Sequence, residues 1–232
     1  MFITEQEFFD YLRCPAYYDM KHNKKTAIEE GISVSKLLSK ISNFFYLSML
    51  NGTIPSMAVL KNKWDSICTK YEKMLDSKQI LQGMGLIFQL VRWAEEERPV
   101  VLDVNTRYQV RFGEYEVTGN LATILKTKQD GYELLITSFS NRLPDQTIVD
   151  MNLSYTLQAY GFKSVYNKDL QGIRIRSVKH ARDFYTSRTE QDFKRLETTV
   201  KNAGKSIQEQ LFYPREYICQ NCPAKIYCKY WC

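Results

Sequence analysis

The stretch Cys219-Gln-Asn-Cys222-Pro-Ala-Lys-Ile-Tyr-Cys228-Lys-Tyr-Trp-Cys232 holds four of the six cysteines of this 232-residue chain. Two cysteines separated by two residues can reach one metal centre from a single tight turn, and Cys228 follows closely. Zinc ions and iron–sulfur clusters both bind such thiolates. Because the stretch contains no histidine, it predicts a metal centre held by thiolates alone.

The fourth ligand of this centre has two candidates. Cys232 is one, and the pattern would then suit a zinc site built from four neighbouring cysteines. The other is Cys14, in Tyr11-Leu-Arg-Cys14-Pro15-Ala-Tyr17-Tyr18. With Cys14 as ligand, the metal would tie the beginning of the chain to its end. Cys68 follows a helical apolar pattern and is predicted to be a small buried hydrophobe.

The composition is that of an ordinary globular protein, with 44% hydrophobic and 25% charged residues. No apolar run is long enough to cross a bilayer, and the N-terminal residues lack the features of a signal peptide. These features predict a cytoplasmic protein. Because the cytoplasm is reducing, the cysteines are expected to be metal ligands rather than disulfide partners.

The positive charge is concentrated in one part of the chain. Residues 163–232 contain 14 Lys+Arg and 7 Asp+Glu, a net +7, whereas residues 1–162 contain the remaining 18 and 19, a net −1. This asymmetry favours a polyanionic partner, with nucleic acid first. A solvated lysine-rich surface is the alternative. Five aromatic residues stand among these C-terminal cations and could stack on bases, although packing in the core is the favoured prediction for them: Tyr213, Tyr217, Tyr227, Tyr230 and Trp231.

Hydrophobic periodicity predicts a mostly helical first part and a mixed second part. Thr4 and Glu7 fit a capping box that opens a short helix leading toward Cys14. Further helices are expected at 31–50, 56–75, 79–97, 150–166 and 189–211. Strands are expected at 100–112, 115–125, 132–139 and 173–178, with a hairpin turn at 129–131.

This order of elements predicts a single α/β domain over residues 1–232. It divides into a helical part at 31–98, an α/β core at 99–188, and a C-terminal helix with the cysteine motif at 189–232. No internal repeat or low-complexity linker interrupts it.

Two phrases of the sequence resemble the RecB-like PD-(D/E)XK nucleases that carry an iron–sulfur cluster. This family includes the small CRISPR-associated exonucleases and the nuclease domain of AddB-type helicase–nucleases. Leu12-Arg-Cys14-Pro15-Ala-Tyr17-Tyr18 is similar to its N-terminal phrase, and Cys219-x-x-Cys222-Pro223-x4-Cys228 to its C-terminal one. The resemblance implies a mixed sheet flanked by helices, with a helical insertion. It also implies a 4Fe–4S cluster on four ligands, with Cys232 as a spare: Cys14, Cys219, Cys222 and Cys228.

The catalytic positions of the family are not preserved. Such nucleases hold Mg²⁺ or Mn²⁺ with carboxylates, which activate water through the bound ion. Ser35 stands where the helix histidine is expected, and Ala122 stands in place of the strand aspartate. Ile136 and Ser138 replace the next acid and the lysine. Thr156 falls at the usual glutamine position, although Tyr160 keeps the tyrosine.

Carboxylates at other positions offer the alternative of an active nuclease with relocated ligands. The candidates are Glu114, Glu116, Glu133, Asp145 and Asp150. Glu114 and Glu116 flank a turn. Glu133 is expected to point to the opposite face of its strand from position 136, because side chains three apart on a strand face opposite ways.

The favoured hypothesis is a catalytically inactive iron–sulfur nuclease fold that binds nucleic acid, DNA first, as a subunit of a DNA or RNA processing complex. Such a protein would suit a mobile-element or phage machine. Five cations are expected to contact phosphates: Arg174, Arg176, Lys179, Arg182 and Arg188. A purely protein-binding subunit is the third hypothesis. His22 and His180 have no paired acid or nucleophile nearby in sequence and are expected to be structural.

Overall fold

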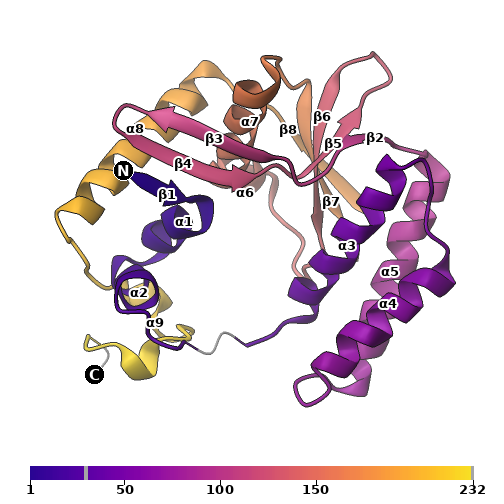
Figure 1. Cartoon of the computed structure of the whole chain (residues 1–232), viewed down its shortest axis with the longest axis horizontal. Helices are drawn as coiled ribbons and strands as arrows, with labels where there is room; N and C mark the ends of the chain where they lie inside the picture. Colours follow the sequence, from indigo (N-terminus) through magenta and orange to yellow (C-terminus); the bar gives the residue numbers. More distant parts are fainter. Residues whose placement is uncertain (29–30, 231–232) are drawn as a thin grey trace. The chain divides into compact units, whose positions relative to one another are not determined.

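The computed structural model describes residues 1–28 and 31–230 (Figure 1), so the predicted spare ligand Cys232 and the aromatic Trp231 lie outside the described residues. The chain divides into two compact units. Unit 1 is made of Met1–Gly31, Arg107–Asn120 and Thr189–Cys232, and unit 2 of Ile32–Thr106 and Leu121–Arg188. Each unit is therefore assembled from segments that are far apart in the sequence.

Unit 2 begins with three helices, α3 (Val34–Leu50), α4 (Met57–Lys70) and α5 (Ser77–Glu97), which pack against one another. Each starts at a residue whose side chain accepts a backbone N–H: Ser33, Ser56 and Asp76. Their apolar faces share one core with residues of the neighbouring sheet. Cys68 is buried in that core, as the periodicity predicted.

The sheet of unit 2 has five strands in the order β2-β5-β6-β7-β8. These are β2 (Val100–Asp103), β5 (Thr123–Lys126), β6 (Tyr132–Ser138), β7 (Gly172–Ser177) and β8 (Arg182–Thr186). Only β6 and β7 pair in parallel. The connection between those two strands contains α6 (Gln146–Met151) and α7 (Leu153–Tyr166), as a parallel pair requires a crossover.

Unit 1 has a three-stranded mixed sheet in the order β1-β4-β3. Its strands are β1 (Phe2–Thr4), β3 (Arg107–Phe112) and β4 (Tyr115–Asn120). Helices α1 (Glu5–Arg13) and α8 (Glu190–Gln208) contact this sheet. Short helices α2 (Pro15–Tyr18) and α9 (Glu216–Cys219) follow, with a π-helical turn at Asp19–Asn23 and a 3-10 turn at Lys225–Tyr227.

The two long strands expected at 100–112 and 115–125 are each interrupted, and the helix expected at 150–166 is two helices. Asn105 has φ 61°, a left-handed conformation that ends β2. As a result β2 pairs with β5 in one sheet, and β3 pairs with β4 in the other. Asn152 is extended, and its side chain accepts the N–H groups of Ser154 and Tyr155, which starts α7 afresh.

The fold class agrees with the expectation at the level of architecture. The chain is a mixed α/β protein with two mixed sheets flanked by helices, and the capping box of Thr4 and Glu7 is present. Strands β1 and β8 were not predicted. Within the described residues, no helix combines the length and apolar character needed to traverse a bilayer.

Candidate functional site

A pocket of about 420 Å³ opens in unit 2 between α3 and strands β5 and β6. Ala122 and Ile136, two of the predicted degenerate positions, both line it. Lys40 is the charged residue of its described lining, which contains no carboxylate. The remaining polar groups of the wall come from serine, threonine, asparagine and tyrosine side chains, so the pocket offers hydrogen bonds and one positive charge.

Local hydrogen bonds fix the walls of this pocket. The backbone N–H of Ala122 donates to Oε1 of Gln158 on α7 at 2.8 Å. The hydroxyls of Tyr46 and Thr137 are 2.7 Å apart, and complete burial of Tyr46 raises the pKa of its phenol. Tyr46 therefore stays neutral and serves as a hydrogen-bonding group. Gln158 had not been singled out from the sequence, although it lies two residues after Thr156 on the same helix.

The degenerate positions Ser35 and Ser138 do not line the pocket. The Ser35 hydroxyl donates to the backbone carbonyl of Phe139 at 3.2 Å, and the Ser138 hydroxyl oxygen accepts from Ser140 N–H at 3.4 Å. Both serines thus stabilise local backbone rather than the pocket wall.

None of the five alternative carboxylates lines this pocket. Glu133 lines a different pocket of unit 2. Burial raises the pKa of its carboxyl group, Arg174 lowers that pKa, and Asp183 and Glu97 raise it by smaller amounts. Glu114 and Glu116 belong to the β3–β4 hairpin of unit 1. The last two have roles in α6: the Asp145 carboxylate caps the helix, and the Asp150 carboxylate accepts from Gln146.

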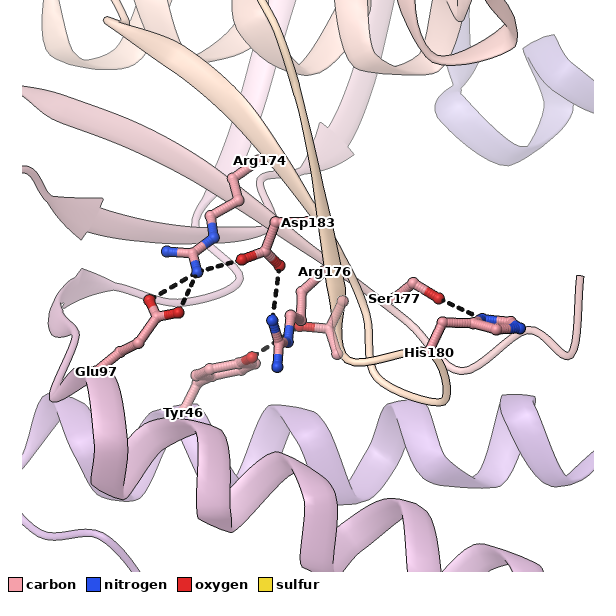
Figure 2. A network of polar contacts seen from close by, with 8 residues as sticks. Tyr46, Glu97, Arg174, Arg176, Ser177, His180 and Asp183 are labelled. Carbon is pink, nitrogen blue, oxygen red and sulfur yellow. Dashed lines mark hydrogen bonds and ion pairs between the residues drawn. The ribbon is translucent and has the colours of Figure 1, made fainter. Parts of the chain in front are cut away.

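Two of the five predicted phosphate contacts lie inside an ion-pair network (Figure 2). Arg174 is 8% exposed, and its guanidinium contacts the carboxylates of Glu97, at 2.6 Å, and Asp183. Arg176 pairs with the other oxygen of Asp183 at 3.2 Å. The Trp93 ring lies about 5.5 Å from both guanidinium groups. These arginines neutralise the largely buried Asp183 carboxylate and the exposed Glu97 carboxylate, which leaves them poorly placed for a phosphate.

The remaining three predicted cations differ in exposure. Arg188 is half-buried, and its guanidinium donates to Thr156, Thr186 and the backbone carbonyls of Val149, Asn152 and Ser187. Lys179 and Arg182 are exposed at the β7–β8 turn. These two remain available to a polyanion in solution.

Both histidines have partners that the sequence did not reveal. The ring of His22 lies 2.8 Å from the Asp10 carboxylate, and Nδ1 of His180 lies 2.9 Å from the Ser177 hydroxyl (Figure 2). The expectation that His22 has no paired acid was therefore wrong, because the partner lies twelve residues earlier, on α1, and the chain turns at Cys14 between the two residues. Lys21 also pairs with Asp10 at 3.1 Å, so the cluster is a charge-balanced contact.

The four predicted cluster ligands line one small cavity in unit 1, shared with Tyr17, Met20, Pro214, Ile218 and Lys225. Cys14 lies between α1 and α2, where Pro15 prevents the preceding residue from continuing the helix. The N–H of Ala16 donates to the carbonyl of Tyr213 at 3.1 Å, which holds α2 against the segment before α9. Cys219, Cys222 and Cys228 follow on α9 and the next two turns.

The chemistry of this cavity is that of a thiol cluster. Burial raises the pKa of the Cys219 thiol, and the neighbouring thiols of Cys14, Cys228 and Cys222 raise it further. A bound cation would relieve this mutual repulsion. Among the described residues, no three Cys, His, Asp or Glu side chains converge as a single ion requires. The donor set consists of four thiols, which both zinc and iron–sulfur clusters accept as ligands.

Comparisons with known proteins connect the fold to a solved structure. No protein-family model matches the chain, and no curated protein matches its sequence. A structure described as "Putative exonuclease" from Eubacterium rectale superposes with a TM-score of 0.61 at 10% identity, covering 97% of this chain and 87% of that one. A second, described as SSO0001, has a TM-score of 0.40 at 12% identity, covering 83% of this chain and 98% of that one. The first likeness shows that this chain shares the fold of that structure.

Proposed function

We propose that this chain binds nucleic acid with a nuclease-like fold and does not cleave it. The observation that carries the proposal is the wall of the α3–β5–β6 pocket. Hydrolysis of a phosphodiester by this type of fold needs a divalent ion held by carboxylates. Here the described wall offers Lys40, amides and hydroxyls instead. Such groups are suited to holding a phosphate without activating water.

Further exposed cations of unit 2 add positive charge to its surface. Lys179 and Arg182 lie at the turn between β7 and β8, and Lys40 lies on α3. Contacts of lysine and arginine with phosphates supply most sequence-independent affinity, and they make binding salt-dependent. The same pattern suits DNA and RNA, and the exonuclease likeness supports DNA as the first probe.

We also propose that Cys14, Cys219, Cys222 and Cys228 hold a 4Fe–4S cluster. Their shared cavity and all-thiol chemistry support this set. The cluster would supply a covalent bridge between segments about 200 residues apart. In the chain-entropy treatment of cross-links, closure of such a loop contributes on the order of 4–5 kcal/mol. Membership of a larger complex stays a prediction.

The test of this function is the affinity for a labelled DNA duplex as a function of salt. Wild-type protein is expected to bind with a Kd that rises steeply as salt increases. Lys40→Gln should weaken binding several-fold and reduce the salt slope by about 1, because one phosphate contact is lost. The matched control is Lys61→Gln on the exposed face of α4, which should leave both values unchanged. Absence of salt-sensitive binding by the wild-type chain would contradict the proposal.

A further inference from the structure

Four C-terminal tyrosines lie on the surface of unit 1 rather than in its core. Tyr213, Tyr217, Tyr227 and Tyr230 are 52%, 76%, 48% and 45% exposed. The expectation that they pack in the core was therefore wrong. The reason is the turn-rich path of residues 209–230, which buries Ala224, partly buries the cysteines and leaves the tyrosine rings outside.

Cations accompany these rings. Nη1 of Arg215 lies 3.5 Å from the Tyr217 hydroxyl, and Nζ of Lys229 lies 4.9 Å from the Tyr230 ring centroid. Lys24 belongs to the same neighbourhood: its pKa is raised first by the hydrogen bond with Asp19, and then slightly by Tyr230 and Cys228. Residues 211–230 contain three cations and a single acid, Glu216. The surface is therefore aromatic and positively charged.

We propose that this aromatic surface, made of Tyr213, Tyr217, Tyr227, Tyr230, Arg215, Lys24 and Lys229, binds single-stranded nucleic acid by stacking. The inference rests on the proposed function. It adds that the bound nucleic acid is single-stranded and that the aromatic surface is a second place where the protein contacts it. Single-strand binding proteins combine cations that follow the backbone with aromatic rings on which bases stack. In a duplex the faces of the bases are already stacked on one another, so only an unpaired strand can offer them.

A protein partner is the competing occupant, and the charge of the surface argues against it. The cores of protein interfaces are depleted in lysine, because its desolvation is unfavourable. Here Lys229 lies beside the Tyr230 ring, and Lys24, paired with Asp19, lies near it, so a protein would have to desolvate both lysines. A phosphate backbone instead neutralises them while the bases contact the tyrosines.

The experiment compares a fluorescein-labelled oligothymidylate of about 20 nucleotides with a duplex of the same length, using the whole protein. Wild type is expected to bind the single strand more tightly. In Tyr217→Leu/Tyr227→Leu the Kd for the single strand should rise at least about tenfold, with little change for the duplex. Tyr217→Phe/Tyr227→Phe retains both rings and should bind within about twofold of wild type. Phe88→Leu, which changes a similarly exposed aromatic residue of α5, is the control.

Each outcome has a defined meaning. A Leu variant that binds the single strand as tightly as wild type, or a wild type that prefers the duplex, overturns the stacking surface. If, in either case, the protein still binds the duplex and Lys40→Gln weakens that binding, the proposed function is retained. A wild-type chain that binds neither probe overturns both. Unchanged melting temperatures of the variants show that the tyrosine effect is local.

Discussion

At the scale of single residues, charge burial decides which cations are available for binding. Arg174 and Arg176 belong to the most basic part of the sequence, and from the sequence alone they resemble the exposed Arg182. The structure places them between Glu97, Asp183 and the Trp93 ring. Sequence periodicity identified their strand correctly. It could not reveal that the acids pairing with them come from α5 and from the neighbouring strand.

Arg174→Met is expected to lower the free energy of unfolding by about 2–3 kcal/mol, because the largely buried Asp183 carboxylate loses one of its two arginine partners. Chemical denaturation of the variant measures this change. Arg182→Met removes an exposed arginine from the adjacent strand, and it should alter stability by less than about 0.5 kcal/mol. Equal changes in the free energy of unfolding for the two variants would show that the ion pairs of Arg174 do not stabilise the fold.

Glu133 should make stability depend on pH in a predictable direction. Burial raises its pKa in the folded protein, so folding favours the protonated form, and the unfolding free energy falls as pH rises above the unfolded-state value of about 4.3. Glu133→Gln removes this cost. The variant should be more stable than wild type at pH 7, by up to about 1 kcal/mol after solvent screening, and the difference should vanish near pH 4.

Thermal denaturation of wild type and variant at both pH values gives the comparison. The exposed Glu72→Gln substitution serves as the control and should show no such pH-dependent gain. A Glu133→Gln protein that is less stable than wild type at pH 7 would mean that the ionised carboxylate makes a favourable contact.

At the scale of the elements, two glycines of one helix have opposite roles. A Cβ on Gly83 would lie 2.2 Å from the ring of the fully buried Trp64, so α4 and α5 approach each other closely at this point. A Cβ on Gly85 would meet nothing within 4 Å. The sequence motif Gly83-Met-Gly85 did not distinguish a close helix contact from an exposed glycine.

Gly83→Ala is expected to destabilise the protein by about 1–3 kcal/mol, because the added methyl group displaces the Trp64 ring from its packed position. Gly85→Ala should instead stabilise it by about 0.5–1 kcal/mol through the higher helix propensity of alanine. Denaturation curves of the pair provide an internal comparison within α5. A stabilising Gly83→Ala would refute the close packing of Trp64.

Elements defined by interactions between residues close in sequence could be predicted, whereas elements defined by distant pairings could not. Local signals were sufficient for the Thr4 capping box and the turn around Asp130, because their partners lie a few residues away. The interruption at Asn105 was missed, because alternation of apolar residues continues through it although the two halves pair in different sheets. Strand β1 was missed since three residues are too few for a periodic signal.

At the scale of the whole molecule, the cysteines are the features that connect distant parts of the sequence. The resemblance of two short phrases to a known family implied the ligand set, and the four cysteines of that set line one cavity of unit 1. That they hold a cluster stays a prediction. The ion pairs and the exposure of the tyrosines depend on the path of the chain in three dimensions. These properties could not be derived from composition or spacing.

Anaerobically purified protein is expected to be brown, with about four iron atoms per chain. Cys14→Ser should lose most of this iron, because one ligand of the cluster is removed. Cys68→Ala, which changes a buried cysteine of unit 2, should retain it. Visible absorbance and metal analysis are the measurements. A colourless protein containing zinc would contradict the cluster assignment.

The most direct test of the central claim is incubation of end-labelled single- and double-stranded DNA with the purified chain in Mg²⁺ and in Mn²⁺. The pocket lined by Lys40, Ala122 and Ile136 predicts DNA that is retarded in a native gel and remains full-length on a denaturing gel. Metal-dependent shortening of the DNA, abolished by Glu133→Gln or Asp150→Asn, would contradict it.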